Sequence, residues 1–155
     1  MRIHLKKLII SILIPLAVGG LSALLTRGNM ESFDSINKPP LSPPAILFPI
    51  VWSVLFILMG IASYLIFVSP KTQQRKNALT LYAVQLIFNF FWSIIFFNLE
   101  AYLFAFIWII ALWILIIITA IKFYRISKPA GILMIPYILW VTFAAYLNLA
   151  IYTLN

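Results

Sequence analysis

Apolar residues form five long runs along the chain, and short polar segments separate them. About 20 mostly apolar residues are enough for an α-helix to cross the ~30 Å hydrocarbon core of a membrane. The runs contain no Lys, Arg, Asp or Glu and occupy residues 8–26, 45–68, 78–97, 101–121 and 130–154. They are continuous rather than alternating, which excludes barrel strands. The pattern predicts an all-α integral membrane protein, a five-transmembrane-helix bundle that forms one domain over residues 1–155.

The composition supports this prediction and narrows the alternatives. The chain is 65% hydrophobic and 9% charged, whereas an ordinary soluble domain is roughly 45–50% apolar and about 25% charged. This composition argues against a soluble monomer and excludes a disordered chain. The first run also resembles a signal peptide, with basic residues before it and a small-residue site at Gly20-Leu21-Ser22. We expect a retained helix instead, because the apolar run continues past Ser22 and four more runs follow.

The net charge of +8 would suggest nucleic-acid binding in a soluble protein. Here the basic residues lie in short clusters between the apolar runs. Nine of the eleven fall on one side of the predicted membrane, at Arg2, Lys6, Lys7, Lys71, Arg75, Lys76, Lys122, Arg125 and Lys128. The positive-inside rule then predicts a cytoplasmic N-terminus, with the first loop and Asn155 outside. We expect a lipid bilayer and no nucleic acid among the partners.

Polar and aromatic side chains recur at four-residue spacing in three of the runs, which places them on one face of each helix. The stripes are Gln85, Asn89 and Ser93, with Trp92 on the flank; Trp52, Phe56 and Gly60; and Trp140, Ala144 and Asn148. In lipid, such side chains must find a partner or line a cavity. Two interpretations are open: interhelical hydrogen bonds that hold the bundle together, or an aromatic pocket in which amide groups orient a ligand.

Other segments lead to further expectations. The run 101–121 has almost no polar side chains, so we expect it to be the most lipid-exposed helix. Gly19 and Gly20 provide a small-residue face for another helix or a flat ligand, and Pro136 is expected to kink the last helix. The first loop, residues 27–44, carries four of the nine prolines and is interpreted either as a lid over the bundle or as a rigid connector.

The chemistry available to the chain is narrow. It has no cysteine, one histidine (His4) and three acidic residues, and no Lys, Arg, His, Asp or Glu lies within the five runs. We therefore expect no metal site, no Ser nucleophile activated by His and an acid, and no ordinary acid–base catalysis. No catalytic residue is assigned. Oxidative chemistry that belongs to a bound ligand is the one enzymatic route left open.

Three segments carry a specific pattern, namely the proline-rich loop with the start of the second run (38–60), Gln85–Phe97 and Pro136–Asn148. In order and spacing they resemble the TspO/MBR family of translocator proteins, also called peripheral benzodiazepine receptors and tryptophan-rich sensory proteins. The resemblance implies a five-helix bundle, often a homodimer, whose ligand cavity is closed by the first loop. It also implies a bacterial plasma-membrane protein whose ligands are porphyrins, such as protoporphyrin IX and haem, with no obligatory cofactor.

Carried over residue by residue, the resemblance implies ligand contacts at Trp52, Phe56, Asn89, Trp92, Trp140 and Ala144, to which we add Gly20, Phe33 and Asn148. The chain departs from the family pattern in the first loop. Ser32-Phe33 stands where Trp-Tyr is usual, so a tyrosine hydroxyl is missing, and Leu41 replaces a tryptophan. No sterol motif is present, which argues against cholesterol binding.

These observations lead to three candidate functions. The first is a membrane ligand-binding and sensory protein for porphyrins and related lipophilic molecules, which would stack on Trp52, Trp92 and Trp140. The second is a transporter of tetrapyrroles or other lipophiles. The third is a light-dependent porphyrin-degrading protein. We favour the first, because the chain has aromatic and amide groups for binding but no charged residue in the membrane for ion coupling.

Overall fold

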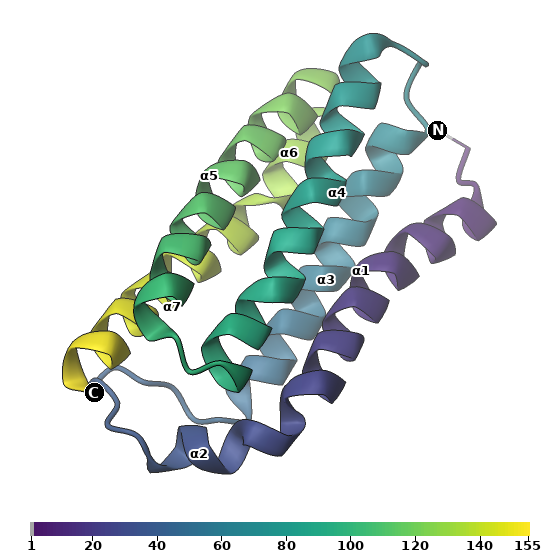
Figure 1. The fold of residues 1–155 in the computed structure, drawn as a ribbon. Helices are drawn as coiled ribbons and strands as arrows, with labels where there is room; N and C mark the ends of the chain where they lie inside the picture. Colours follow the sequence, from purple (N-terminus) through teal and green to yellow (C-terminus); the bar gives the residue numbers. More distant parts are fainter. Residues whose placement is uncertain (1) are drawn as a thin grey trace.

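The computed structural model describes residues 2–155, apart from the side chains of residues 30–32. Within this part, five helical stretches are long and apolar enough to cross a membrane. They are α1 (Leu5–Thr26) with the 3-10 turn η1 (Arg27–Asn29), α3 (Leu47–Phe67), α4 (Gln73–Ser93) with the π-helical turn η2 (Ile94–Asn98), α5 (Tyr102–Ile126), and α6 (Lys128–Leu133) with α7 (Ile135–Leu154). The short helix α2 (Met30–Ser35) lies in the first loop. The predicted all-α bundle of five spans is confirmed (Figure 1).

The helices extend beyond the apolar runs at the end of the bundle that carries the N-terminus. α1 begins at Leu5 rather than at residue 8, α4 begins at Gln73 rather than 78, and α5 ends at Ile126 rather than 121. Lys, Arg and Gln favour helix, and their long side chains lie along a helix while the polar group reaches the membrane surface. Hydrophobicity marks the part of a helix inside lipid, so it does not mark where the helix itself ends.

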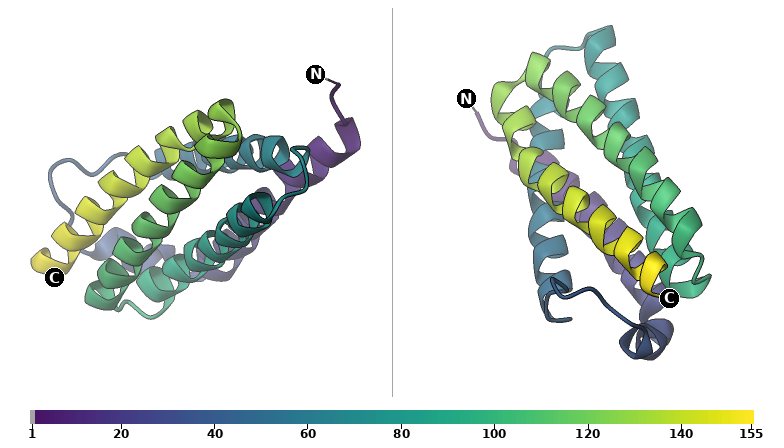
Figure 2. Two further views of the ribbon diagram at one scale, coloured as in Figure 1. Left: turned by 90° about the horizontal axis from the view of Figure 1, so that it is seen from above. Right: turned by 90° about the vertical axis from the view of Figure 1, so that its left-hand side faces the viewer.

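The spans are arranged in a ring. α1 packs along α3 and also meets α4, α4 packs along α5, and α5 packs along α6 and α7. α3 packs against α6. The chain then continues as α7, which crosses the bundle obliquely and diverges from α3 (Figure 2). The break between α6 and α7 falls at Met134, directly before Pro136, as expected from the proline. The candidate site lies where α3 and α7 diverge.

The expectation that the fourth run is the most lipid-exposed helix is wrong. In the most apolar stretch of α5, 33% of the residues are buried, compared with 11% in α1. α5 lies between α4 and α7 and buries Ala105, Ile109, Leu112 and Ile116 at helical spacing. Because α5 is apolar all round, its sequence offers no contrast between a buried face and a lipid-facing one.

Gly60 allows α1 and α3 to approach each other closely. A Cβ atom at Gly60 would overlap with backbone atoms of Ser11 and Ile12 in α1. Backbone atoms cannot rotate away as a side chain can, so an added methyl group would force the two helices apart. Gly20, by contrast, has open space at the same position.

Replacing Gly60 by Ala is therefore expected to lower the free energy of unfolding by about 1–3 kcal/mol, although Ala favours a helix over Gly by about 1 kcal/mol. Gly20→Ala is the matched control and is expected to keep or slightly raise stability. Thermal unfolding of both variants in one detergent measures the difference. Equal unfolding midpoints would contradict the close approach of α1 and α3.

Candidate functional site

A buried chain of hydrogen bonds joins α4 to α7 at the centre of the bundle. The Asn89 side-chain amide donates to the Tyr137 hydroxyl over 2.8 Å. The same hydroxyl donates to the Gln85 side-chain oxygen over 2.7 Å. All three side chains are buried. The Tyr137 hydroxyl thus pairs with an N–H of Asn89 and with the side-chain oxygen of Gln85, two residues that lie one helical turn apart on α4.

A second set of hydrogen bonds joins α4, α5 and α7 nearer the end of the bundle where the C-terminus lies. The Trp92 indole N–H donates to the Asn148 side-chain oxygen over 3.0 Å. The Asn148 amide in turn donates to the Tyr102 carbonyl oxygen over 2.8 Å. Asn148 therefore uses both ends of its amide group to hold neighbouring helices together.

Gln85 and Asn89 of α4 and Asn148 of α7 therefore face inward, as the spacing predicts. In this structure their amides bond to groups of neighbouring helices, which is the first of the two interpretations of these residues. Ala144 is also buried on the inner face of α7. The pocket interpretation remains a prediction for Asn89, Trp92, Ala144 and Asn148.

The predicted site residues of α3 are Trp52 and Phe56, whose rings lie beside Tyr137 of α7 and Gly19 of α1. Trp52 stacks on Phe56 with ring centroids 5.5 Å apart, and its ring meets the edge of Tyr137 at 6.2 Å. The Phe56 ring packs directly against Gly19 of α1. Phe56 is buried and Trp52 is half-buried.

Gly20 is a predicted site residue that the structure places apart from the bundle interior. It is exposed, and no atom of another helix lies near the position of a Cβ there. The reason is helical geometry: one residue along a helix is a turn of about 100°, so Gly19 faces Phe56 while Gly20 faces away from the bundle.

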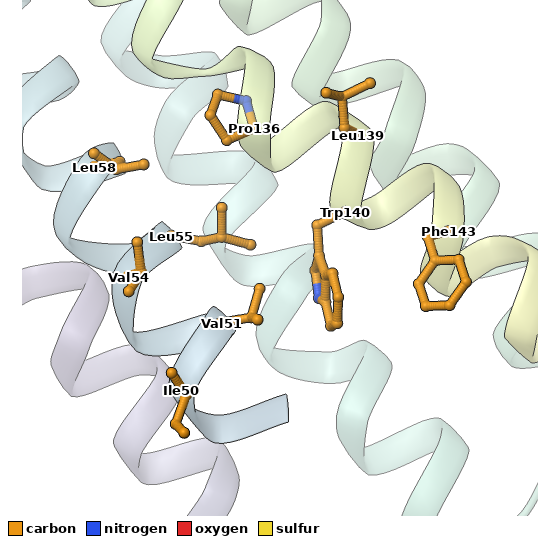
Figure 3. A pocket seen from close by; sticks show the side chains of 9 residues that line it. All are labelled: Ile50, Val51, Val54, Leu55, Leu58, Pro136, Leu139, Trp140 and Phe143. Carbon is orange, nitrogen blue, oxygen red and sulfur yellow. The ribbon is translucent and has the colours of Figure 1, made fainter. Parts of the chain in front are cut away.

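An apolar groove of about 460 Å³ lies between α3 and α7, on the lipid-facing side of the bundle. Val51, Val54 and Leu55 form the α3 wall. Trp140 projects from the α7 wall across the groove, beside Phe143 (Figure 3). The two walls diverge because α7 crosses α3 obliquely, so the groove widens away from α6.

The Trp140 indole N–H is buried and finds no acceptor among the described residues. Its ring is held between Phe48 at 5.8 Å and Phe143 at 5.7 Å, measured between ring centroids. Other tryptophans in the bundle differ: Trp108 donates to the Phe88 carbonyl oxygen and Trp113 to the Thr142 hydroxyl. Among the described residues, Trp140 is therefore the tryptophan whose buried indole N–H lacks an acceptor.

The first loop lies across the end of the bundle where the C-terminus lies (Figure 1). Phe33 of α2 packs against Phe97 with ring centroids 5.3 Å apart, and thus contacts η2 rather than the groove. The Asn37 backbone N–H donates to the Asn155 side-chain oxygen over 3.1 Å. The Asn155 amide donates back to the Asn37 carbonyl oxygen over 2.8 Å. These contacts tie the loop to both η2 and the end of α7.

Candidate metal ligands are not clustered in the part of the chain that the structure describes. No group of three His, Cys, Asp or Glu side chains lies close enough there to hold a metal ion. The groups that meet in the bundle are amides, hydroxyls and aromatic rings. This set can bind and orient a neutral or lipophilic molecule.

A profile of the TspO/MBR family matches residues 11–154 of the chain. The tryptophan-rich protein TspO of Chlorobaculum tepidum is 41% identical over 79% of this chain and 78% of its own length. The protein of the same name from Archaeoglobus fulgidus is 37% identical over 98% of this chain and 99% of its own length. The translocator protein of Bos taurus is 32% identical over 88% of this chain and 82% of its own length. The chain belongs to the TspO/MBR family.

Membership of the TspO/MBR family confirms the resemblance stated from the three sequence segments. The matched region includes every helix that builds the site, from most of α1 to α7. Relatives carry the names tryptophan-rich sensory protein and translocator protein. At this level the chain is an integral membrane protein of a sensory and translocator family.

Sequence reasoning missed Tyr137, which joins the two amides of α4, and it missed the residues that line the groove beside Trp140. A signal for Tyr137 was present: this residue precedes Ala144 by seven residues and Asn148 by eleven, which places all three on one helix face. A tyrosine in a membrane helix can lie at the membrane surface or in the protein core. In a sequence so rich in aromatic residues, nothing indicated that the Tyr137 hydroxyl would form hydrogen bonds in the core.

Proposed function

We propose that this TspO/MBR protein binds a flat lipophilic molecule in the groove between α3 and α7, with a porphyrin such as protoporphyrin IX as the leading candidate. The observation that carries the proposal is the unpartnered indole N–H of Trp140 beside this groove. The membrane interior has no water to accept its hydrogen bond, and a buried donor without an acceptor costs about 1–3 kcal/mol. A turn of the Trp140 ring that brings its N–H to an acceptor on a ligand in the groove would remove this cost.

The shape and chemistry of the groove also support a flat aromatic ligand. Its volume lies within the roughly 300–1,000 Å³ of typical ligand pockets, and its walls consist of aliphatic and aromatic side chains. Trp140 and Phe143 present ring faces and edges on which a planar ligand stacks. The open side of the groove leaves room for the part of a larger ligand that extends into lipid.

The inner residues give the ligand a route toward the centre of the bundle. Trp52 contacts Tyr137, which lies one turn before Trp140 on α7. Outward movement of α7 from α3 would extend the groove to Trp52 and then to the hydrogen-bonded pair Asn89 and Tyr137. The residues predicted from the sequence would then contact the ligand as a second layer behind Trp140.

Replacing Trp140 by Phe tests the proposal, because it keeps an aromatic wall and removes only the N–H donor. We expect the affinity for protoporphyrin IX, measured by saturable quenching of tryptophan fluorescence in detergent, to fall by about tenfold. Trp113→Phe is the matched control, since the Trp113 N–H already bonds to Thr142. Equal affinities of the two variants would count against the groove as the binding site.

Transfer of a lipophile across the membrane is a second candidate function. The observation that favours it is the lateral opening of the groove toward lipid, because a molecule dissolved in the bilayer can enter there without passing the first loop. The test is porphyrin flux into proteoliposomes. Flux that matches protein-free vesicles would eliminate transfer and leave binding untouched.

For orientation, we propose that the N-terminus faces the cytoplasm of a bacterial cell. The basic end of the bundle supports this, since cytoplasmic loops carry the excess of Lys and Arg. The chain has no cysteine, so single introduced cysteines report on each side separately. We expect Ser42→Cys to react with an impermeant thiol reagent in intact cells and Ser127→Cys to react only after lysis; the reverse pattern would invert the orientation.

A further inference from the structure

The two ends of the bundle differ sharply in charge. The end that carries the N-terminus has nine Lys and Arg residues and no Asp or Glu, whereas all three acidic residues lie at the opposite end, in α2 and just before α5. The nine cations therefore have no carboxylate side chain at their own end with which to pair. Like charges repel unless an anion from outside the chain is placed among them.

Cations from two different helices converge on one aromatic ring at this end. The Lys7 ammonium of α1 lies 5.8 Å from the centroid of the Phe67 ring. The Arg75 guanidinium of α4 lies 5.1 Å from the same centroid. Arg75 is held there by a hydrogen bond to the Ser69 carbonyl oxygen at 3.2 Å. The His4 backbone N–H, which donates to the Tyr64 hydroxyl over 2.8 Å, keeps the start of α1 beside α3.

A hollow of about 660 Å³ lies at the beginning of α4, and Arg75, which contacts the Phe67 ring, is one of the residues that line it. Lys71, Arg75 and Lys76 line one part of it. Leu79 and Ala83 line an apolar part, one and two turns after Arg75 on α4, and the remaining lining residues are Thr72, Gln73 and Thr80. The hollow thus combines a cationic part at the level of the membrane surface with an apolar part that continues along the helix toward the membrane interior.

The geometry points to a binding site for an anionic phospholipid at this place. We propose that Lys71, Arg75 and Lys76, which line the hollow, hold the phosphate of the headgroup, while one acyl chain lies along the exposed face of α4. That face continues from Ala83 to Ile87, which is 54% exposed. A free phosphate ion would use the cations alone, whereas a phospholipid uses the apolar part of the hollow as well.

The test measures the affinity of the full-length protein for phosphatidylglycerol by thermal-shift titration in an uncharged detergent. Each cation near a membrane surface contributes on the order of fivefold to the attraction of an anionic lipid. We therefore expect the triple variant Lys71→Gln/Arg75→Gln/Lys76→Gln to bind phosphatidylglycerol on the order of 100-fold more weakly. The matched control is Lys122→Gln/Arg125→Gln/Lys128→Gln, which removes three charges from the same end and is expected to lose much less affinity.

Three results would overturn the proposal. One is equal loss in the two triple variants, which would mean that only the total charge of this end matters. Another is an equal shift with phosphatidylcholine, which has no net charge. The third is an equal shift with inorganic phosphate, which would identify a site for a soluble anion. None of these results bears on the groove between α3 and α7, so the two proposals stand or fall separately.

Discussion

Replacing Tyr137 by Phe is expected to lower the free energy of unfolding by about 1–3 kcal/mol. The hydroxyl accepts from Asn89 and donates to Gln85, so its removal leaves one donor and one acceptor buried without a partner. The ring itself stays, which leaves the packing against Trp52 in place. Thermal or denaturant unfolding in detergent measures the change.

The control for this prediction is Tyr152→Phe, which removes a hydroxyl from an exposed side chain of the same helix. We expect no measurable change from it. The double variant Asn89→Leu/Tyr137→Phe provides a further check, because groups in one hydrogen-bond chain are not additive. A loss in the double variant equal to the sum of the two single losses would show that Asn89 and Tyr137 act independently, against the structure.

Filling the groove between α3 and α7 is expected to have the largest effect on ligand binding. Val54 lines the groove and is 50% exposed, so Val54→Trp adds a large side chain where the ligand would lie without disturbing a buried core. We expect the affinity for protoporphyrin IX to fall by at least about tenfold, since the ligand would have to displace the new ring. Equilibrium binding of the porphyrin, followed by its own absorbance, measures the loss.

Ile57→Trp is the matched control for the filled groove. Ile57 is also an exposed residue of α3, and it lies outside the groove. The control is expected to bind protoporphyrin IX as the unchanged protein does. If both variants bind normally, the ligand lies elsewhere, and the inner face around Asn89 and Trp92 becomes the place to look.

The spans could be predicted from the sequence because one physical constraint dominates: charged side chains are excluded from lipid. That constraint places the five runs and separates the basic end from the other. It does not fix helix ends, so α4 starts five residues before its apolar run. It also does not rank the helices by burial, because α5 is apolar on every face and only packing decides which face is covered.

The inward direction of Gln85, Asn89 and Asn148 also follows from the sequence, since a polar stripe on a membrane helix must find partners. The groove between α3 and α7 could not be predicted from the sequence. Its walls are ordinary apolar residues of α3 and α7, and it exists because α7 crosses α3 obliquely after the break at Met134. A crossing angle depends on the packing of all the helices and leaves no local signal in the chain.

The most direct test of the central claim is the NMR signal of the Trp140 indole N–H in ¹⁵N-labelled protein, assigned with Trp140→Phe. Added protoporphyrin IX is expected to shift this signal, because the N–H gains an acceptor and a ring neighbour. The signals of Trp108 and Trp113 are expected to stay nearly unchanged, since both indoles already donate within the bundle. Saturable binding that leaves the Trp140 signal in place would contradict the account.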